Sequence, residues 1–340
     1  MRTLLLLTAA ATLLAACGTP AGSGGAATNN GGPPATGSGT ILFVRGDNIF
    51  STAASGGAEV QLTHESNGNF ANNPIFSPDG STIAYAHHVA PSGNNWGGVE
   101  LHLMQADGTG DNVLVPSKTK GERAETPAWT PDGQSIYFAH DVPIIDDHDK
   151  YTGDTLTVER YDLGSGKSEV VQRDAIMPAI GKTGSMAWVN YNVTNSSFKL
   201  QVSSAPGDTP RTLLSDKDFQ AILSPAISPD GQAILFSGSG RTSSTVGSVG
   251  RTLAQALNPL VPGEAEAHGL PWDPWVIGID GKGLKKLASI GSDEQSMSWS
   301  PDGQEIVFSN LSSTYLMRAD GSGLTRLLNH GDPGGISWKA

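Results

Sequence analysis

The sequence contains a single cysteine, Cys17, in 340 residues. A chain with one cysteine cannot form an intramolecular disulfide, so the fold must be held together without one. Charged residues make up only 16% of the chain, and acidic side chains outnumber basic ones, 33 to 21, for a formal net charge of −12. This balance disfavours nucleic acid and anionic lipid surfaces as partners, because both would repel the protein.

Sequence signatures of catalysis are also missing. There is no Gly-x-Ser-x-Gly nucleophile elbow, and Gly181-Lys182-Thr183 lacks the upstream glycine of a phosphate-binding loop. Helical periodicity is nearly absent as well, which predicts an all-β protein. These absences favour a binding protein over an enzyme.

What the sequence does contain is an internal repeat, a signal that outranks other sequence patterns. Each copy has a short apolar run, a Pro-Asp-Gly turn and a second apolar run, as in Asn73–Ala86. Proline presets φ for a turn and Asp-Gly tolerates left-handed backbone, so each copy predicts a β-hairpin. The first half of the repeat recurs at Thr126–Gly133, Ser224–Gly231 and Ser296–Gly303, with a degraded copy at Met177–Gly184.

The second strand of the repeat occurs six times, as a small or polar residue, two apolar residues and an aromatic residue. The copies are Thr40–Phe43, Thr82–Tyr85, Ser135–Phe138, Ser185–Trp188, Ala233–Phe236 and Glu305–Phe308. Continuous apolar runs indicate strands covered on both faces, as in small twisted sheets that stack against neighbours. We therefore predict a six-bladed β-propeller that forms one domain, residues 40–340.

The two ends of the repeat region complement each other. The region opens on a second strand, Ile41–Val44, without a first strand before it, and closes on a first strand, Gly335–Lys339. One blade is thus expected to be shared by the termini, with Ile336–Trp338 pairing with Ile41–Val44. This pairing would join two otherwise open strand edges and close the ring.

The first 39 residues have a different composition. Residues 1–16 combine Arg2, an apolar run from Leu4 to Leu14 and small residues, the pattern of a secretory signal peptide and too short for a spanning helix. Residues 17–39 are mostly Gly, Ala, Ser, Thr, Pro and Asn, which bury too little apolar surface to become ordered. We expect a flexible tether that begins at Cys17.

Two resemblances to known families follow from these residues. The repeat Pro-x-Trp/Phe-Ser-Pro-Asp-Gly-x-x-Ile-x-Phe resembles that of TolB-type six-bladed β-propellers, a WD40-like class of bacterial exported proteins, over residues 40–340. This implies a propeller that binds other proteins at one face. Leu14-Ala15-Ala16-Cys17 resembles the lipobox of bacterial lipoproteins. That resemblance implies a lipid on Cys17 and an exported protein, anchored to the bacterial membrane and facing the periplasm or the cell exterior.

The longest connections predict where a ligand binds. His87–Gly98, His140–Gly153 and Gly238–Pro274 each join a second to a third strand, at the end of the propeller opposite the Ser-Pro-Asp-Gly turns. Long loops in a compact domain are often functional. We predict that a ligand binds this end, although tryptophans that pack a loop onto its own blade are an equally good interpretation. The candidate binding residues are Trp96, Asp147, His148, Trp272 and Trp275.

Two groups of side chains are candidate metal ligands. Asp146, Asp147, Asp149 and Asp154 crowd one loop, where carboxylate oxygens suit Ca²⁺, although a solvated acidic loop is the plainer interpretation because the spacing of a dedicated calcium loop is missing. His87, His88, His140 and His148 fall near the ends of second strands in neighbouring blades. Such a cluster would resemble the metal site of an oligogalacturonate lyase, whereas exposed loop histidines are the plainer interpretation. No cofactor is predicted.

The sequence therefore predicts a monomeric, membrane-tethered propeller that binds a protein or peptide of the cell envelope and is not catalytic. The alternative is a carbohydrate-active or metal-dependent, lyase-like enzyme on the same fold.

Overall fold

The computed structural model describes residues 36–340 except 94–95, 193–195, 242–271 and 291–293. The signal peptide, Cys17, most of the tether and most of the 238–274 connection therefore lie outside the described residues. The described residues form 24 strands and no helix, which confirms the all-β prediction. Accordingly, no helix capable of crossing a membrane is found in this part of the chain.

Four of the sheets are blades of four antiparallel strands. The first contains β24 (Ile336–Lys339), β1 (Thr40–Arg45), β2 (Asn48–Ala53) and β3 (Val60–Gln61). The others are β12 (Ala175–Ile180), β13 (Met186–Asn192), β14 (Ser197–Ser203) and β15 (Arg211–Ser215); β16 (Phe219–Ile227), β17 (Ala233–Arg241), β18 (Trp272–Gly278) and β19 (Lys285–Lys286); and β20 (Ser296–Trp299), β21 (Glu305–Ser309), β22 (Thr314–Arg318) and β23 (Thr325–Leu328).

The fifth sheet has eight strands. Six separate blades would instead have given two sheets of four strands in its place. It contains β4 (Phe70–Phe76), β5 (Thr82–Val89), β6 (Gly98–Gln105), β7 (Asn112–Val115), β8 (Arg123–Trp129), β9 (Ser135–Ile145), β10 (Tyr151–Asp162) and β11 (Lys167–Arg173). The two halves, β4–β7 and β8–β11, are each antiparallel. A single parallel contact between Val99 and Arg123 joins them, with the Val99 amide donating to the Glu122 carbonyl at 3.0 Å.

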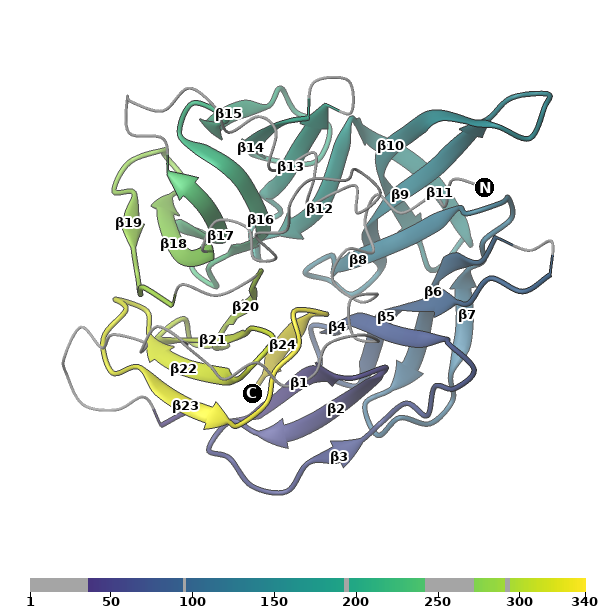
Figure 1. Cartoon of the computed structure of the whole chain (residues 1–340). Coiled ribbons are helices and arrows are strands. Elements are labelled where there is room, and N and C mark those ends of the chain that lie inside the picture. Colours follow the sequence, from purple (N-terminus) through teal and green to yellow (C-terminus); the bar gives the residue numbers. More distant parts are fainter. Residues whose placement is uncertain (1–35, 94–95, 193–195, 242–271, 291–293) are drawn as a thin grey trace, which may run out of the picture.

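The sheets are arranged around a common centre (Figure 1). The first strand of each four-strand set packs against the first strand of the next, from β24 to β4, β8, β12, β16, β20 and back to β24. Strands β1 and β24 pair as expected, with Ile41 opposite Trp338 and Phe43 opposite Ile336. The chain is thus a β-propeller in which segments from the two ends of the described chain share a sheet.

The Pro-Asp-Gly turns are held by the aspartate side chain. The Ser77 hydroxyl donates to Asp79 Oδ1 at 2.6 Å, and the Ser81 amide donates to the same oxygen at 3.0 Å. Gly80 has φ of 72°, which a Cβ would strain. The hydrogen bond from Ser77 is the main reason that the pKa of Asp79 falls to about 2. The same hydroxyl-to-aspartate bond recurs at Thr130–Asp132, Ser228–Asp230 and Ser300–Asp302.

A bulge in the first strands is a feature that the sequence analysis missed. Asn73, Thr126, Met177 and Ser224 each precede a proline and have φ between 49° and 53°. The register of pairing with the second strand shifts at this point in all four copies. Gly335 holds the equivalent position with φ of 116°. A Cβ there would lie 2.6 Å from Asn73 Cα, because neighbouring first strands approach closely.

The second strands form the core. The six repeat aromatics, Phe43, Tyr85, Phe138, Trp188, Phe236 and Phe308, are each at most 2% exposed. Apolar clusters lie between successive sheets: one joins Ile41, Phe43 and Trp338 to Val307 and Leu316 of the preceding sheet. Burial on both faces, expected from continuous apolar runs, is confirmed.

Removing residues 335–340 tests the pairing of β1 with β24. The deletion would expose the edge of β1 and remove Trp338, whose side chain is 7% exposed and whose indole N–H donates to the Ser38 carbonyl at 2.7 Å. Truncating a buried aromatic costs about 3–5 kcal/mol. We expect a strongly lowered midpoint of thermal unfolding and self-association through the open edge. Deletion of Ala340 alone should leave both properties unchanged; equal melting of the two deletions would contradict this role of β24.

Candidate functional site

Two histidines and a glutamate converge on one face of the β5–β6 hairpin. Side chains alternate between faces along a strand, so Tyr85 and His87 of β5 share a face, and their cross-strand partners are His102 and Glu100 of β6. This face packs toward the β24–β3 sheet, because Tyr85 belongs to the same apolar cluster as Leu42 and Leu62. The cluster therefore lies between two neighbouring sheets, near the end of the hairpin that carries the β5–β6 loop.

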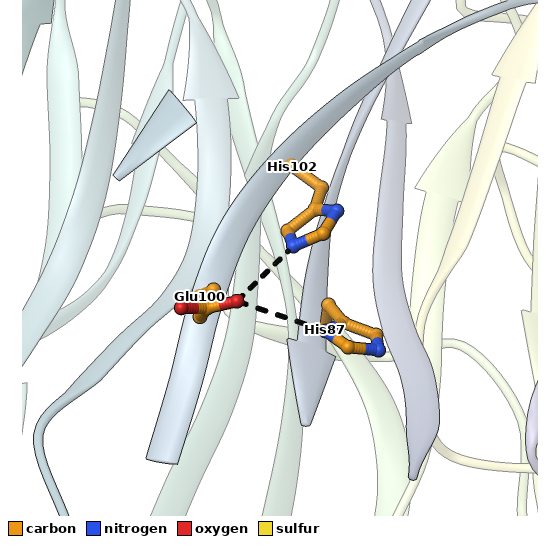
Figure 2. Close-up of side chains that lie close together, drawn as sticks. All are labelled: His87, Glu100 and His102. Carbon is orange, nitrogen blue, oxygen red and sulfur yellow. Dashed lines mark hydrogen bonds and ion pairs between the residues drawn. The ribbon is translucent and has the colours of Figure 1, made fainter. Parts of the chain in front are cut away.

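Figure 2 shows Glu100 facing both imidazole rings. Glu100 Oε2 lies 3.5 Å from His102 Nε2 and 4.0 Å from His87 Nδ1. The ring centroids are 4.6 Å apart. The side chains of His87, Glu100 and His102 are 15%, 21% and 7% exposed, so the site is enclosed but not sealed.

Two further carboxylates hold the outer ring nitrogens. His87 Nε2 lies 3.1 Å from Glu65 Oε2, in the link between β3 and β4. His102 Nδ1 lies 3.0 Å from Asp111 Oδ1, and the Tyr85 hydroxyl donates to that oxygen at 2.7 Å. The hydrogen bond with Glu65 raises the pKa of His87 above its ordinary value, against the opposing effect of burial.

His140 occupies the same repeat position as His87, two residues after the repeat aromatic. Its Nδ1 lies 2.7 Å from Glu159 Oε1 and its Nε2 lies 2.9 Å from Glu122 Oε1. Burial would lower the pKa of His140, but the hydrogen bonds with these two carboxylates raise it overall. Both ring nitrogens of His140 are therefore engaged by carboxylates.

The four histidines proposed as one cluster are placed in different surroundings. His88 stacks on Phe70 with ring centroids 3.9 Å apart and its Nε2 lies 3.0 Å from Asn72 Oδ1, while burial holds its pKa well below the ordinary value. His148 is exposed in the β9–β10 turn. Sequence reasoning missed Glu100 and His102. The signal for them was the alternation of Glu100 and His102 with Val99, Leu101 and Leu103 along one strand.

The aspartates proposed as a Ca²⁺ site are engaged elsewhere. Asp146 Oδ1 accepts the amides of His148 and Lys150, which fixes the turn. Asp149 pairs with Lys120 at 2.8 Å, and Asp154 accepts a hydrogen bond from the Tyr151 hydroxyl. Asp147 is exposed. Among the described residues, the one group of three or more acidic, histidine or cysteine ligands within metal-binding distance is His87, Glu100 and His102.

Of the residues proposed for the binding face, Trp272 and Trp275 lie on β18 and are 9% and 6% exposed. Trp275 packs edge-on against Phe219, with ring centroids 5.0 Å apart, so both indoles belong to the interior. Trp96 is half-buried, with Lys120 Nζ 5.2 Å above its ring. Asp147 and His148 are exposed at the loop-bearing end.

Two neighbouring carboxylates, one of them buried, lie on β9 and β10. Asp141 of β9 is 6% exposed and sits beside Asp154 of β10 and the ion pair of Arg123 with Glu125 on β8. Burial, reinforced by the charge of Asp154, raises the pKa of Asp141 to about 8. A cavity of about 10 Å³ touches Asp141, Glu125 and Thr126, which is room for about one water molecule.

No family model matches the chain, and neither does any curated protein at a significant level. Solved structures do. TolB from Acinetobacter baumannii is similar with a TM-score of 0.64 and 16% identity, over 90% of this chain and 68% of that one. A putative TolB from Agrobacterium tumefaciens has a TM-score of 0.52 and 14% identity, over 76% of this chain and 83% of that one. At these identities the likeness shows the fold alone: a TolB-like β-propeller.

The buried carboxyl of Asp141 predicts a pH dependence of stability. The pKa of Asp141 is raised to about 8 in the folded protein, so the folded state keeps a proton that the unfolded chain has released above about pH 4. The contribution of Asp141 to stability therefore falls as pH rises from about 4 to 8. Groups that face Asp141 are Asp154 and Tyr151 on β10 and Arg123 and Glu125 on β8.

The variant Asp141→Asn removes this titration while keeping the size and neutral charge of the protonated acid. We expect it to raise the unfolding midpoint at pH 8 more than at pH 5, as measured by thermal melts across the range. The exposed Asp147→Asn should leave the pH profile unchanged. If the profile of the Asp141→Asn variant were as steep as that of the parent, Asp141 would not be the buried acid.

Proposed function

We propose that this chain is an exported, lipid-anchored, six-bladed β-propeller that binds a protein or peptide partner in the bacterial envelope without catalysing a reaction. Six blades are supported by the two antiparallel halves of the eight-stranded sheet, which meet at one residue pair and each carry a full copy of the repeat. Closure of the ring is supported by the contacts that run through all six first strands and by the pairing of β1 with β24.

The observation that carries the binding role is the hairpin of β9 and β10. These strands have 11 and 12 residues, against at most nine in any other described second or third strand. The hairpin extends away from the ring (Figure 1). Ile144, near its tip, is 50% exposed. An apolar side chain on a protruding element is accessible to a partner, and its burial in the contact would be favourable.

Other residues at the same end of the propeller are also accessible to a partner. Leu311, in the connection between β21 and β22, is 48% exposed. Lys120 links the loops of neighbouring blades, because it pairs with Asp149 at 2.8 Å and lies over the Trp96 ring. The tip of the hairpin carries exposed Asp147 and His148 beside Ile144. A partner with an apolar contact point and basic side chains around it would complement this surface.

The membrane anchor is proposed from Cys17 and the composition of residues 17–39. A flexible chain of about 22 residues has a typical reach of about 25 Å, which holds a domain just above a bilayer. Multiple acyl chains anchor a protein stably, whereas one chain of myristoyl length does so only marginally.

Replacing the proposed lipid attachment residue tests the anchor. Cys17→Ser should move the protein from the membrane fraction to the soluble fraction, as followed by fractionation and immunoblotting. Ser23→Ala, in the same segment, should leave the protein in the membrane fraction. Unchanged membrane retention of the Cys17→Ser variant would contradict the proposal.

A matched pair of surface variants tests the binding surface. Ile144→Asp places a charge at the hairpin tip, while Val170→Asp changes a residue of nearly equal exposure, 47%, on the outermost strand of the same blade. We expect proteins captured from envelope extract by the unmodified chain to be lost, at least tenfold, with Ile144→Asp and retained with Val170→Asp. Their quantification by mass spectrometry provides the readout. Loss with both variants, or with neither, would place the surface elsewhere.

A charge pair gives an independent check on the acidic tip. Asp147→Lys should weaken capture of the same proteins. Lys182→Glu, an exposed lysine in the turn between β12 and β13 at the opposite end, should leave capture unchanged. The reverse pattern would assign binding to the turn-bearing end.

A further inference from the structure

We propose that His87, Glu100 and His102 form a binding site for one divalent transition-metal ion, with Zn²⁺ as the best match. Two imidazole nitrogens and a carboxylate oxygen are a donor set that Zn²⁺ favours, with a fourth position for water or another carboxylate. One donor atom of each residue lies within 4.8 Å of the other two. The site is separate from the proposed partner-binding β9–β10 hairpin, so failure of one proposal would leave the other unaffected.

The donor atoms point toward a common space. His87 Nδ1 is buried and has no hydrogen-bond partner, and it lies 4.0 Å from Glu100 Oε2. His102 Nε2 lies 3.5 Å from the same oxygen. Ligands of a tetrahedral Zn²⁺ at about 2.1 Å are about 3.4 Å apart. The observed separations therefore need only a small inward movement of side-chain tips.

The outer carboxylates fix the ring nitrogens that face the site. A metal-ligating histidine usually donates its other N–H to a carboxylate, which sets the tautomer and orients the ring. Glu65 engages His87 Nε2 at 3.1 Å, which leaves the lone pair of Nδ1 toward Glu100. Asp111 engages His102 Nδ1 at 3.0 Å, which leaves Nε2 toward the same side. Both histidines thus show the carboxylate–histidine arrangement of a metal site.

The carboxylates around the two imidazoles also favour a bound cation. Glu65, Glu100 and Asp111 surround the two imidazoles, and no lysine or arginine in the described ranges forms an ion pair with any of the three. With Asp111 at its Nδ1, His102 turns Nε2 toward the Glu100 carboxylate. Partly buried like charges are destabilising unless a positive charge lies between them. A divalent ion bound by Glu100 and both rings supplies that charge.

The neighbouring blade provides an internal comparison. His140 stands at the same repeat position as His87, but carboxylates occupy both of its ring nitrogens, at 2.7 and 2.9 Å. It therefore has no free lone pair to offer a metal. The difference is that Glu100 approaches His87 Nδ1 only to 4.0 Å, beyond hydrogen-bonding distance. Because His87 Nδ1 has no hydrogen-bond partner and both nitrogens of His140 do, the proposed site lies on the β5–β6 hairpin.

The test uses the full chain, purified without a histidine tag, freed of metal by chelation and titrated with Zn²⁺ in a calorimeter. We expect one Zn²⁺ per chain and a rise in the unfolding midpoint with Zn²⁺ concentration, because binding to the folded state alone stabilises it. Ca²⁺, which prefers oxygen ligands, should show neither effect.

Variants identify the ligands. His87→Ala should abolish stoichiometric Zn²⁺ binding, and Glu100→Gln, which keeps the shape of the side chain, should weaken it at least tenfold. Glu65→Gln should weaken it about 10- to 100-fold by freeing the His87 ring. His140→Ala, the matched control, should bind Zn²⁺ like the parent. Circular dichroism checks folding, and Glu100→Gln decides the result if His87→Ala does not fold. Full affinity in Glu100→Gln, or no stoichiometric binding by the parent, would overturn the proposal.

Discussion

Burial of the second strands on both faces is the constraint on which this structure depends. Each small sheet covers one face of its neighbour, and the repeat aromatics lie in the layers between them. A strand with two buried faces has nowhere to place a polar side chain except near its ends, where links between sheets run past. The position two residues after the repeat aromatic lies near such an end. His87 and His140 meet carboxylates of those links, and Asn190 donates to the Asp174 carbonyl in the next one.

A histidine at the same repeat position has different surroundings in two hairpins of the eight-stranded sheet. In the β9–β10 hairpin carboxylates engage both ring nitrogens of the histidine, whereas in the β5–β6 hairpin one ring nitrogen has no hydrogen-bond partner. The change requires no alteration of the fold, because the frame is set by turns and buried aromatics. Polar positions at sheet boundaries can therefore vary as long as each local charge is compensated.

Much of the fold was predictable from the sequence because its signals are local. Pro-Asp-Gly fixes each turn through bonds within five residues, and the apolar runs fix burial. The join between Val99 of β6 and Arg123 of β8 was not predictable, because it depends on how two neighbouring sets of strands meet. The left-handed backbone at Thr126 and Met177 was not predictable either, because it occurs where first strands of neighbouring sets pack together. Threonine and methionine do not favour that conformation on their own.

The candidate site was predictable only in part. His87 could be singled out from its repeat position, but Glu100 and His102 become its neighbours through cross-strand register, which a turn outside the regular repeat sets. Trp272 was placed in the Gly238–Pro274 connection, and Trp275 directly after it. In the structure Pro274 sits inside β18, opposite Ser237, and the strand carries both indoles inward.

The pairing of β1 with β24 also constrains the order in which the molecule is completed. Ile41 and Trp338 are joined across almost the whole length of the domain, and contacts between distant residues form slowly because the intervening chain must first be closed into a loop. Ribosomes deliver a chain from its N-terminus. Strand β1 must therefore wait, with one edge uncovered, until β24 has emerged. A chaperone that shields Ile41–Val44 during that interval would act on the one sheet that cannot assemble early.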